Sequence, residues 1–366
     1  MEDQTSQNTD KSQRFQYLDV VRGIAAVAVV ATHIFELGVP GFRRMASTGC
    51  NLGLFGVLLF FIVSGTVISA SIERAPTLKV FWLQRFWRLF PAYWASLILS
   101  AVLFLIVPAE LNFPIYGNIR DRFWSTFGAN LTMLQGFIGF DHFVPAYWTL
   151  GFEMMFYFAL SLFFLMRIGR HAHLVLWAIS GFLVVASIYG FLKGSHIGSF
   201  KVTLCGYFWL GIWVHRMLKN EVSLKRFWTA LLTFQSSVAL TWYVNFNLYP
   251  AKIPEAYSEY PFTPIAMLVA FVGATIVFVW FLLLRNKSFP KALIAIGNVS
   301  FSLYLFHSIA IRLGGMAFEQ KASPFLFTVV TIVMTVFLTV ISYRFVELPS
   351  LAKVKAIKLA AQLPGN

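Results

Sequence analysis

The sequence predicts an all-α fold, a polytopic membrane helix bundle of about ten transmembrane helices plus one short re-entrant or interfacial helix. Of the 366 residues, 58% are hydrophobic and only 12% are charged, and the mean hydropathy is +0.71. Long apolar runs recur along the whole sequence, and Lys and Arg gather in the short segments between them. A soluble core would not hide so much apolar surface, so lipid is expected to cover much of it.

The apolar runs define the expected spans in chain order. Each run is close to the roughly 20 residues that a helix needs to cross a bilayer. Segment 123–138 is shorter and more polar, so it is expected to be the re-entrant or interfacial helix on the outer face. The runs cover residues 19–37, 52–72, 91–108, 147–166, 172–192, 200–217, 227–246, 262–284, 292–312 and 324–346.

Basic residues between the runs set the predicted orientation, because they share one side only if 123–138 does not cross the membrane. Both termini are then cytoplasmic, with a polar segment at 1–18, a membrane domain at 19–348 and a basic tail at 349–366. The basic clusters lie in residues 73–90, 167–171, 216–226, 285–291 and 349–366. The outer side receives residues 247–261 and, against the rule, Arg43, Arg44, Arg120 and Arg122.

The net charge of +14 would also suit a nucleic-acid-binding protein. Because the basic residues sit in short clusters between apolar runs, no nucleic-acid partner is expected. Cys50 and Cys205 form neither a disulfide framework nor a metal-ligand pattern, so no metal site is expected. The first apolar run begins only at Val20 and contains Arg22, which is unlike a cleavable signal peptide.

Ionisable residues inside the first expected span are candidates for function, because charges at membrane depth are costly. Arg22 and His33 lie eleven residues apart, which puts them on one face of a helix and about 16 Å apart along its axis. Asp19 precedes Arg22 by three residues and can pair with it. The alternatives are that Arg22 extends to the cytoplasmic interface and that His33 only joins two helices.

Two further ionisable residues are expected at the depth of His33. Glu153 lies near the outer end of the fourth span and His307 in the outer half of the ninth. An imidazole beside a carboxylate is the usual pairing of a general base with its orienting group. The alternatives are an ion pair between Glu153 and a cation of another span, and a hydrogen bond between helices for His307.

Two other patterns allow a structural and a functional interpretation. Ser64 and Gly65 end an apolar stretch, so they favour either close helix packing or a gap for a narrow ligand chain. Arg85 and Arg88 share one helix face at the inner rim of the membrane. They indicate either cytoplasmic anchoring beside aromatic residues or a two-arginine clamp for phosphate.

Six groups of residues, taken in chain order, resemble the motifs of acyltransferase family 3, a family of membrane-bound acyltransferases. Each group alone is unspecific, but six in the right order cover most of the chain. Thr149, Phe301 and Thr66 depart from the family pattern, which bears on the shape of the acyl and acceptor sites. The groups are Leu18-Asp19, Arg22-Gly23 and His33; Phe60 to Gly65; Arg85, Arg88, Pro91 and Tyr93-Trp94; Trp148-Thr149-Leu150, Glu153 and Phe156-Tyr157; Gly297, Ser300, Ser302-Leu303-Tyr304-Leu305 and His307; and Glu347 with Pro349.

The resemblance implies that an acyl group, acetyl by default, passes from acyl-CoA to a hydroxyl of a sugar. The acceptor would be a surface polysaccharide, such as an exopolysaccharide or lipopolysaccharide, a glycolipid or a related glycoside at the bacterial inner membrane. Acyl-CoA is then a donor substrate, and no permanently bound cofactor is expected. Arg22, Arg85 and Arg88 would hold the CoA phosphates, and the thioester arm would pass Ser64 and Gly65.

The resemblance also implies roles at the reacting end. His33 would take the proton of the acceptor hydroxyl, and Glu153 would orient it. A covalent acyl-His33 intermediate is the alternative. Three further motif residues would bind the acceptor or stabilise the oxyanion, namely Trp148, Tyr304 and His307. Asp19 and Glu347 would be structural members of the motifs.

Two other functions fit a polytopic chain with intramembrane charges. A transporter or flippase for a lipid-linked sugar usually has two related halves, and the sequence shows no such symmetry. A scaffold of a polysaccharide assembly complex would not need the motif residues, all of which are present. Because the sequence ends soon after its last apolar run, we do not expect the soluble hydrolase-like domain that some family members carry. The oligomeric state is left open.

Overall fold

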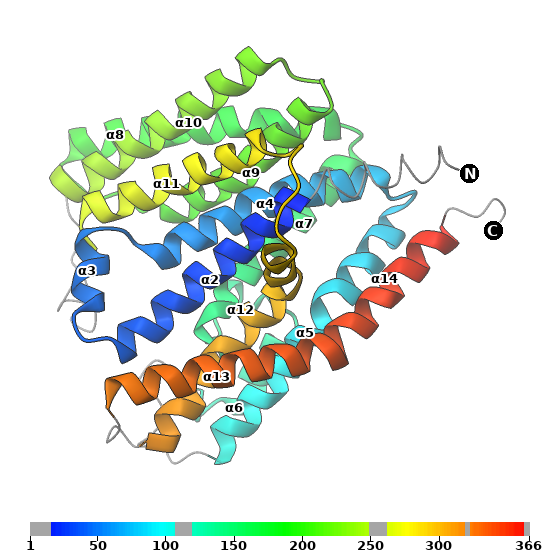
Figure 1. Ribbon diagram of the computed structural model, residues 1–366. Coiled ribbons are helices and arrows are strands. Elements are labelled where there is room, and N and C mark those ends of the chain that lie inside the picture. Colours follow the sequence, from blue (N-terminus) through cyan, green and yellow to red (C-terminus); the bar gives the residue numbers. More distant parts are fainter. Residues whose placement is uncertain (1–15, 107–118, 249–261, 319–322, 362–366) are drawn as a thin grey trace. The chain divides into compact units, whose positions relative to one another are not determined.

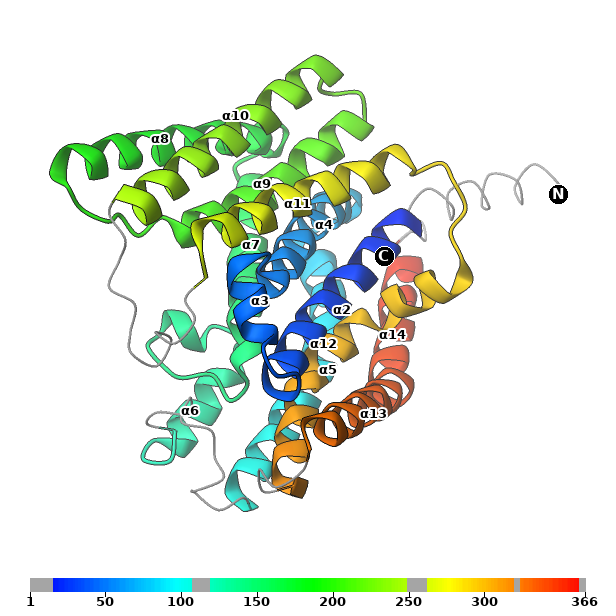
Figure 2. The ribbon, with the colours of Figure 1, turned by 60° about the vertical axis from the view of Figure 1, so that its left-hand side comes forward.

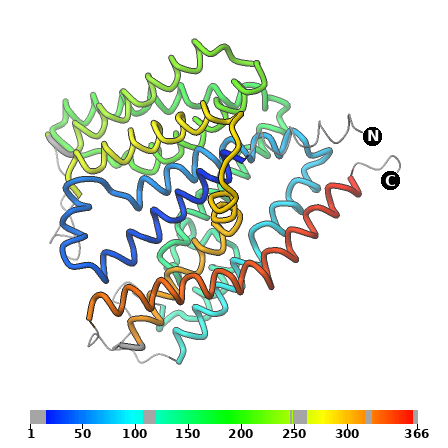
Figure 3. Tube along the Cα trace, viewed as in Figure 1, coloured from blue at the N-terminus to red at the C-terminus, as the bar shows by residue number. Residues whose placement is uncertain are grey.

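The computed structural model describes residues 16–106, 119–248, 262–318 and 323–361 (Figure 3). These residues form helices joined by turns and short loops, with no strand among them, so the predicted all-α fold is confirmed. The chain divides into two compact units. Unit 1 holds residues 1–32, 41–70 and 162–298, and unit 2 holds residues 33–40, 71–161 and 299–366.

The helices follow the apolar runs closely (Figure 1). The α-helices are α2 Gln16–Gly38, α3 Phe42–Thr48, α4 Leu52–Arg74, α5 Leu78–Ile106, α6 Phe123–Asn130, α7 Trp148–Leu165, α8 Val175–Lys193, α9 Phe200–Leu218, α10 Leu224–Tyr243, α11 Pro264–Leu283, α12 Lys291–Phe318, α13 Pro324–Ser342 and α14 Leu348–Ala360. Short 3₁₀ turns are η3 Gln135–Phe137, η4 Pro145–Tyr147 and η5 Gly169–Leu174, and π-helical turns are η6 Val244–Leu248 and η8 Tyr343–Glu347.

Local sequence signals explain several helix starts. The side chains of Ser223, Thr263 and Ser323 accept hydrogen bonds from backbone N–H groups three residues on, at the starts of α10, α11 and α13. Such caps satisfy N–H groups that have no partner inside the helix. Pro264 and Pro324 open α11 and α13, where a missing N–H costs nothing.

Unit 1 is built around α9, which lies against α8 and α10, while α11 packs on α10 (Figures 1 and 2). Most side chains of α9 between Thr203 and Arg216 are buried. Gly65 of α4 packs on this helix, because a side chain there would collide with the backbone carbonyl of Phe208, and Gly211 lies against Gly65 in return. The space at Gly65 is therefore filled by α9, which supports the packing interpretation of this motif.

Unit 2 contains α5, α6, α13 and α14 with the greater parts of α7 and α12. Helices α13, η8 and α14 follow one another without a break as one long helical segment (Figure 3), and α14 packs along α5 (Figure 1). Ser96 of α5 donates to the carbonyl of Leu305 in α12 at 3.2 Å and exchanges a 2.7 Å hydrogen bond with the hydroxyl of Tyr147. These buried hydroxyls tie α5, η4 and α12 together without leaving a polar group in an apolar interior.

Within the described residues, eight segments are long and apolar enough to cross a membrane, which supports a multi-pass membrane protein. They match eight of the expected spans and are Gln16–Gly38, Leu52–Arg74, Leu78–Ile106, Pro145–Leu165, Gly169–Lys193, Pro264–Leu283, Lys291–Met316 and Pro324–Ala360. The expected spans at 200–217 and 227–246 are present as α9 and α10 but are more polar. Neighbouring helices cover α9, so its own surface need not be apolar.

Two segments differ from the expectation. Residues 73–90 are not a loop, because α4 continues to Arg74 and α5 begins at Leu78, so the basic residues extend two helices. Pro76 and Thr77 mark the turn, and the Thr77 side chain accepts from the Val80 N–H at 3.3 Å. Residues 348–360, most of which belong to the expected basic tail, form helix α14. The apolar pattern began the third span only at residue 91 and predicted no helix in the tail, although charged residues are good helix formers outside a bilayer.

The doubtful segment 123–138 forms the short helix α6 and the turn η3, and it is not among the span-length helices. Buried polar residues hold it in place. The Tyr93 hydroxyl donates to the carbonyl of Asn130 at 2.6 Å, and the Asn130 amide donates to the carbonyl of Asp141 at 2.9 Å. Residues 249–261, most of the expected outer loop 247–261, lie outside the described residues, as do 1–15 and 362–366.

Candidate active site

The structure brings His33 and His307 together in unit 2. His33 lies near the end of α2 and His307 in α12, and their Nδ1 and Nε2 atoms are 3.1 Å apart. The rings are stacked, with centroids 5.1 Å apart and planes 18° from parallel. His307 is fully buried, whereas His33 is half-buried. Two residues 274 positions apart in sequence, each in a helix long and apolar enough to cross a membrane, thus share one hydrogen bond.

The contacts of His307 fix which nitrogen carries its proton. Its Nδ1 lies 2.7 Å from the backbone carbonyl of Tyr304, and a carbonyl only accepts, so Nδ1 is the donor. In the neutral ring, Nε2 is then an acceptor, which the Ser308 hydroxyl also approaches at 3.1 Å. His33 then donates through Nδ1, and in a neutral ring its Nε2 is the acceptor nitrogen.

Glu153 is tied to the next turn of its own helix. The Tyr157 hydroxyl donates to Glu153 Oε1 at 2.5 Å. The guanidinium of Arg85 lies 5.9 Å from the centre of the Tyr157 ring and donates to the hydroxyl of Ser71 at 3.0 Å. Glu153, Tyr157 and Arg85 thus form a polar chain inside unit 2. The orienting contact of Glu153 with His33 stays a prediction.

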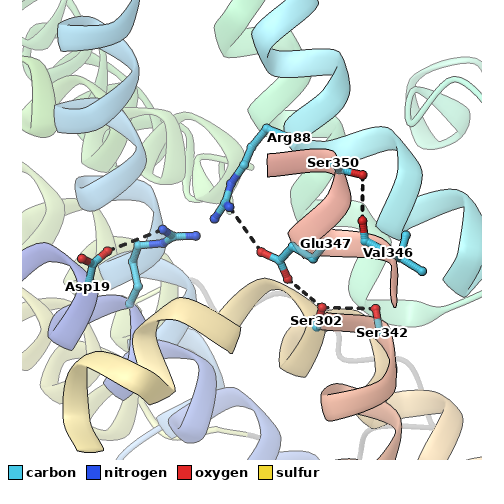
Figure 4. A network of polar contacts seen from close by, with 8 residues as sticks. Asp19, Arg88, Ser302, Ser342, Val346, Glu347 and Ser350 are labelled. Carbon is cyan, nitrogen blue, oxygen red and sulfur yellow. Dashed lines mark hydrogen bonds and ion pairs between the residues drawn. The ribbon is translucent and has the colours of Figure 1, made fainter. Parts of the chain in front are cut away.

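Arg88 and Glu347 form an ion pair, with Nη1 and Oε1 3.2 Å apart (Figure 4). Only 1% of the Glu347 side chain is exposed, and the Ser302 hydroxyl donates to Oε2 at 2.7 Å. Ser342 lies 3.2 Å from Ser302 and extends the network. A buried carboxylate needs such partners. Glu347 therefore joins η8 to α5 and α12, in keeping with the structural place that the sequence suggests.

The hydroxyl of Tyr304 is engaged with the start of α7. It lies 2.7 Å from Thr149 Oγ1 and donates to the carbonyl of Ala146 at 2.9 Å, which Thr149 also approaches at 3.1 Å. Both hydroxyl protons are used inside this cluster. Tyr304 would have to break these bonds to donate to an oxyanion, whereas its carbonyl already positions His307. Trp148 is half-buried, with its ring 5.8 Å from that of Phe152.

His142 lies outside the span-length helices, in the connection between η3 and η4. The amide of Gln135 donates to His142 Nδ1 at 2.8 Å. Burial lowers the pKa of His142 below its usual range, although the neighbouring Asp141 opposes this shift. A neutral ring is consistent with an Nδ1 that accepts. His142 is not among the site residues predicted from the sequence.

The remaining predicted site residues belong to unit 1. Asp19 Oδ1 and Arg22 Nη1 are 3.9 Å apart, so the expected ion pair is present. Ser64 is half-buried beside Gly65 in α4. Among the described residues, no group of three or more His, Cys, Asp or Glu side chains is placed to hold a metal ion.

Sequence reasoning missed several partners in the site. Tyr157 follows Glu153 by four residues, the spacing of neighbours on a helix face, so it could have been found from the sequence. The hydroxyls of Thr149, Ser302 and Ser71 contact residues from other helices. No periodicity within one helix predicts those contacts.

Comparison with known proteins shows the family to which the chain belongs. A family model described as an acyltransferase domain matches residues 15–344. The chain belongs to this acyltransferase family. This acyltransferase resembles the peptidoglycan O-acetyltransferase OatA of Listeria monocytogenes, with 22% identity over 91% of the chain and 55% of the relative. It also resembles the O-acetyltransferase OatA of Staphylococcus aureus, with 25% identity over 95% of the chain and 59% of the relative.

A putative O-acetyltransferase of Staphylococcus aureus is 24% identical over 93% of the chain and 58% of its own length. The acyltransferase chain thus spans between 55% and 59% of the length of these curated relatives. No solved structure matches it.

Proposed function

We propose that the chain is an integral membrane O-acyltransferase. It transfers an acyl group, acetyl by default, from acyl-CoA to a sugar hydroxyl of a cell-surface glycan. The His33–His307 pair supports the proposal, because a neutral His33 that donates through Nδ1 to His307 has its basic nitrogen at Nε2, in a half-buried site. The family and the O-acetyltransferase names of the relatives support acyl transfer. The bacterial inner membrane is the proposed location.

The reaction is a direct displacement. His33 Nε2 removes the proton of the acceptor hydroxyl as its oxygen attacks the thioester carbonyl carbon. The C–O bond forms, the carbonyl oxygen takes the negative charge, and the C–S bond then breaks. The CoA thiolate takes the proton from His33 Nε2 and leaves as a thiol. Acyl ester and free CoA are the products, and the enzyme returns to its starting state.

His307 supports this cycle without contacting the substrate. When His33 becomes an imidazolium, its Nδ1–H bond to His307 Nε2 becomes a charge-assisted hydrogen bond and strengthens. Glu153 supplies a negative charge within the same unit, and we assign it the role of balancing the imidazolium. Proton transfer by a positioned base contributes about 10² to 10⁴-fold to a rate.

The donor is assigned to the basic end of unit 2. Arg85 donates to Ser71 rather than to a carboxylate in the contacts described, so its guanidinium keeps its positive charge for a phosphate. Arg88 shares its charge with Glu347 and is the weaker candidate. Arg22, in unit 1, pairs with Asp19 and stays a prediction as a third phosphate ligand.

The full chain, reconstituted in lipid vesicles and given labelled acetyl-CoA with a glycan acceptor, tests the proposal. We expect the label to appear in the glycan with the native chain and not with His33→Ala, while both proteins insert equally well. A chain that moves a lipid-linked sugar across the vesicle membrane without acetylating it would be a transporter. Label in the glycan with His33→Ala would remove His33 from the role of base.

A further inference from the structure

One face of helix α14 ends at Lys358, a lysine that has no role in the proposed mechanism. Glu347, Ser350 and Val354 are all buried, and their spacing of three and four residues puts them on one face of a helix. Lys358 follows Val354 by four residues and so extends the same face. Because α14 packs along α5 (Figure 1), this stripe is the side turned toward α5.

The end of α4 reaches the same part of α5. The Ser71 hydroxyl accepts from Arg85 Nη2 at 3.0 Å, which fixes the last turn of α4 beside α5. Arg74 lies three residues beyond Ser71, on the same helix face and about 4.5 Å further along the axis. Three elements of unit 2, the end of α4, α5 and α14, therefore bring cations to one place.

These cations are close enough to act on one another. Lys358 interacts electrostatically with Arg85, Arg74 and Arg88. Glu347 offsets one of the four charges through its ion pair with Arg88. Four cations of like charge thus meet at one place, and a bound polyanion would relieve the repulsion between them.

Exposure is graded across the cluster. Lys358 and Arg74 are exposed, whereas Arg85 and Arg88 are half-buried. In acyl-CoA the diphosphate lies between the acyl-bearing arm and an adenosine that carries a 3′-phosphate. If the arm points into unit 2, the 3′-phosphate is the outermost anionic group, at the level of the exposed cations.

We infer that Lys358 and Arg74 bind the 3′-phosphate of the donor, and that Arg85 faces its diphosphate. The inference rests on the proposed use of acyl-CoA. It makes α14 a part of the donor site and gives the enzyme a preference for CoA over 3′-dephospho-CoA. The lysine acts here as a compact point charge, which suits a terminal phosphate.

Binding of CoA and of 3′-dephospho-CoA to the full chain in lipid nanodiscs tests this inference, alongside acetyl transfer. Lys358→Ala should weaken CoA binding about tenfold and leave 3′-dephospho-CoA binding unchanged. Lys353→Ala is the matched control, because it removes an exposed lysine of the same helix from a different face. We expect it to bind both ligands as the native chain does.

Equal CoA affinities of the Lys358→Ala and Lys353→Ala variants would overturn the inference, as would a native chain that binds both nucleotides equally. The phosphate that the cluster binds could also come from a lipid headgroup. Measurements in nanodiscs with and without anionic lipid distinguish this source from CoA. If Lys358→Ala changed only the retention of anionic lipid, the cluster would bind lipid headgroups and the inference would be wrong. A chain that binds CoA through this lysine yet transfers no acetyl group would instead contradict the proposed function.

Discussion

At the scale of single residues, the site depends on how two histidines share one proton. The carbonyl of Tyr304 holds His307 Nδ1 in its protonated form, and His33 then donates to His307 Nε2. Neither step requires a charged residue, which matters in a buried site where charge is costly. In the proposed mechanism His307 is thus a positioning residue, and His33 Nε2 acts as the base.

Replacing His307 tests this division of roles. His307→Phe keeps an aromatic ring but removes the acceptor, so we expect kcat for acetyl transfer to fall about 10 to 100-fold with an unchanged KM for acetyl-CoA. His307→Gln offers an amide oxygen to His33 and should recover part of the rate. Full activity of the phenylalanine variant, or no rescue by glutamine, would contradict the positioning role.

The sequence predicted the depth of these residues better than their pairing. The position of a residue within a span gives its level, so His33 and His307 could be placed together. It does not give the rotation of one helix against another, so the hydrogen bond between Tyr157 and Glu153 was not predicted, and the contact of Glu153 with His33 stays a prediction. Hydroxyl contacts between helices, such as Tyr304 with Thr149, depend on the same rotation.

At the scale of helices, the sequence predicted the apolar part of each span well, but it did not predict how far a helix continues into the charged residues beside it. Apolar runs of about twenty residues identified the spans because a bilayer demands that length. Charged stretches gave no such signal, so the third span was predicted to begin only at residue 91, and no helix was predicted in the basic tail at 349–366. Both helices carry basic residues of the proposed donor site, so the proposed site includes the segments where the helix prediction was weakest.

Close helix packing at Gly65 gives a prediction for α4. A methyl group there would collide with the carbonyl of Phe208, so Gly65→Ala should destabilise unit 1 by about 1 to 3 kcal/mol. Gly181→Ala is the control, because a methyl group there meets nothing within 4 Å. Thermal unfolding in detergent measures both. An alanine at 65 that lowered only acetyl-CoA affinity would favour the ligand-gap interpretation.

At the scale of the whole chain, the orientation in the membrane rests on segment 123–138. Its helix α6 has only eight residues, too few to cross a bilayer. Asp121 and Asp141 flank the segment, and both are exposed. In the predicted topology both lie outside, together with the acceptor, while the basic end of unit 2 lies inside with CoA.

Single cysteines placed at positions 121 and 141 test that topology. In a background with Cys50→Ala and Cys205→Ala, both should react with a membrane-impermeant thiol reagent added to intact cells. A cysteine at position 355 should react only after the membrane is opened. Labelling of positions 121 and 141 from opposite sides would show that the segment crosses and would reverse the orientation of every helix after it.

The protonation state of His33 tests the central claim most directly. Solid-state NMR of the chain labelled with ¹⁵N-histidine in lipid, compared with His33→Gln to assign the signals, reports which nitrogen carries the proton. We predict a neutral His33 with a protonated Nδ1 hydrogen-bonded to His307 and an unprotonated Nε2. A protonated Nε2 with a bare Nδ1 would leave no base facing the acceptor and would contradict the account.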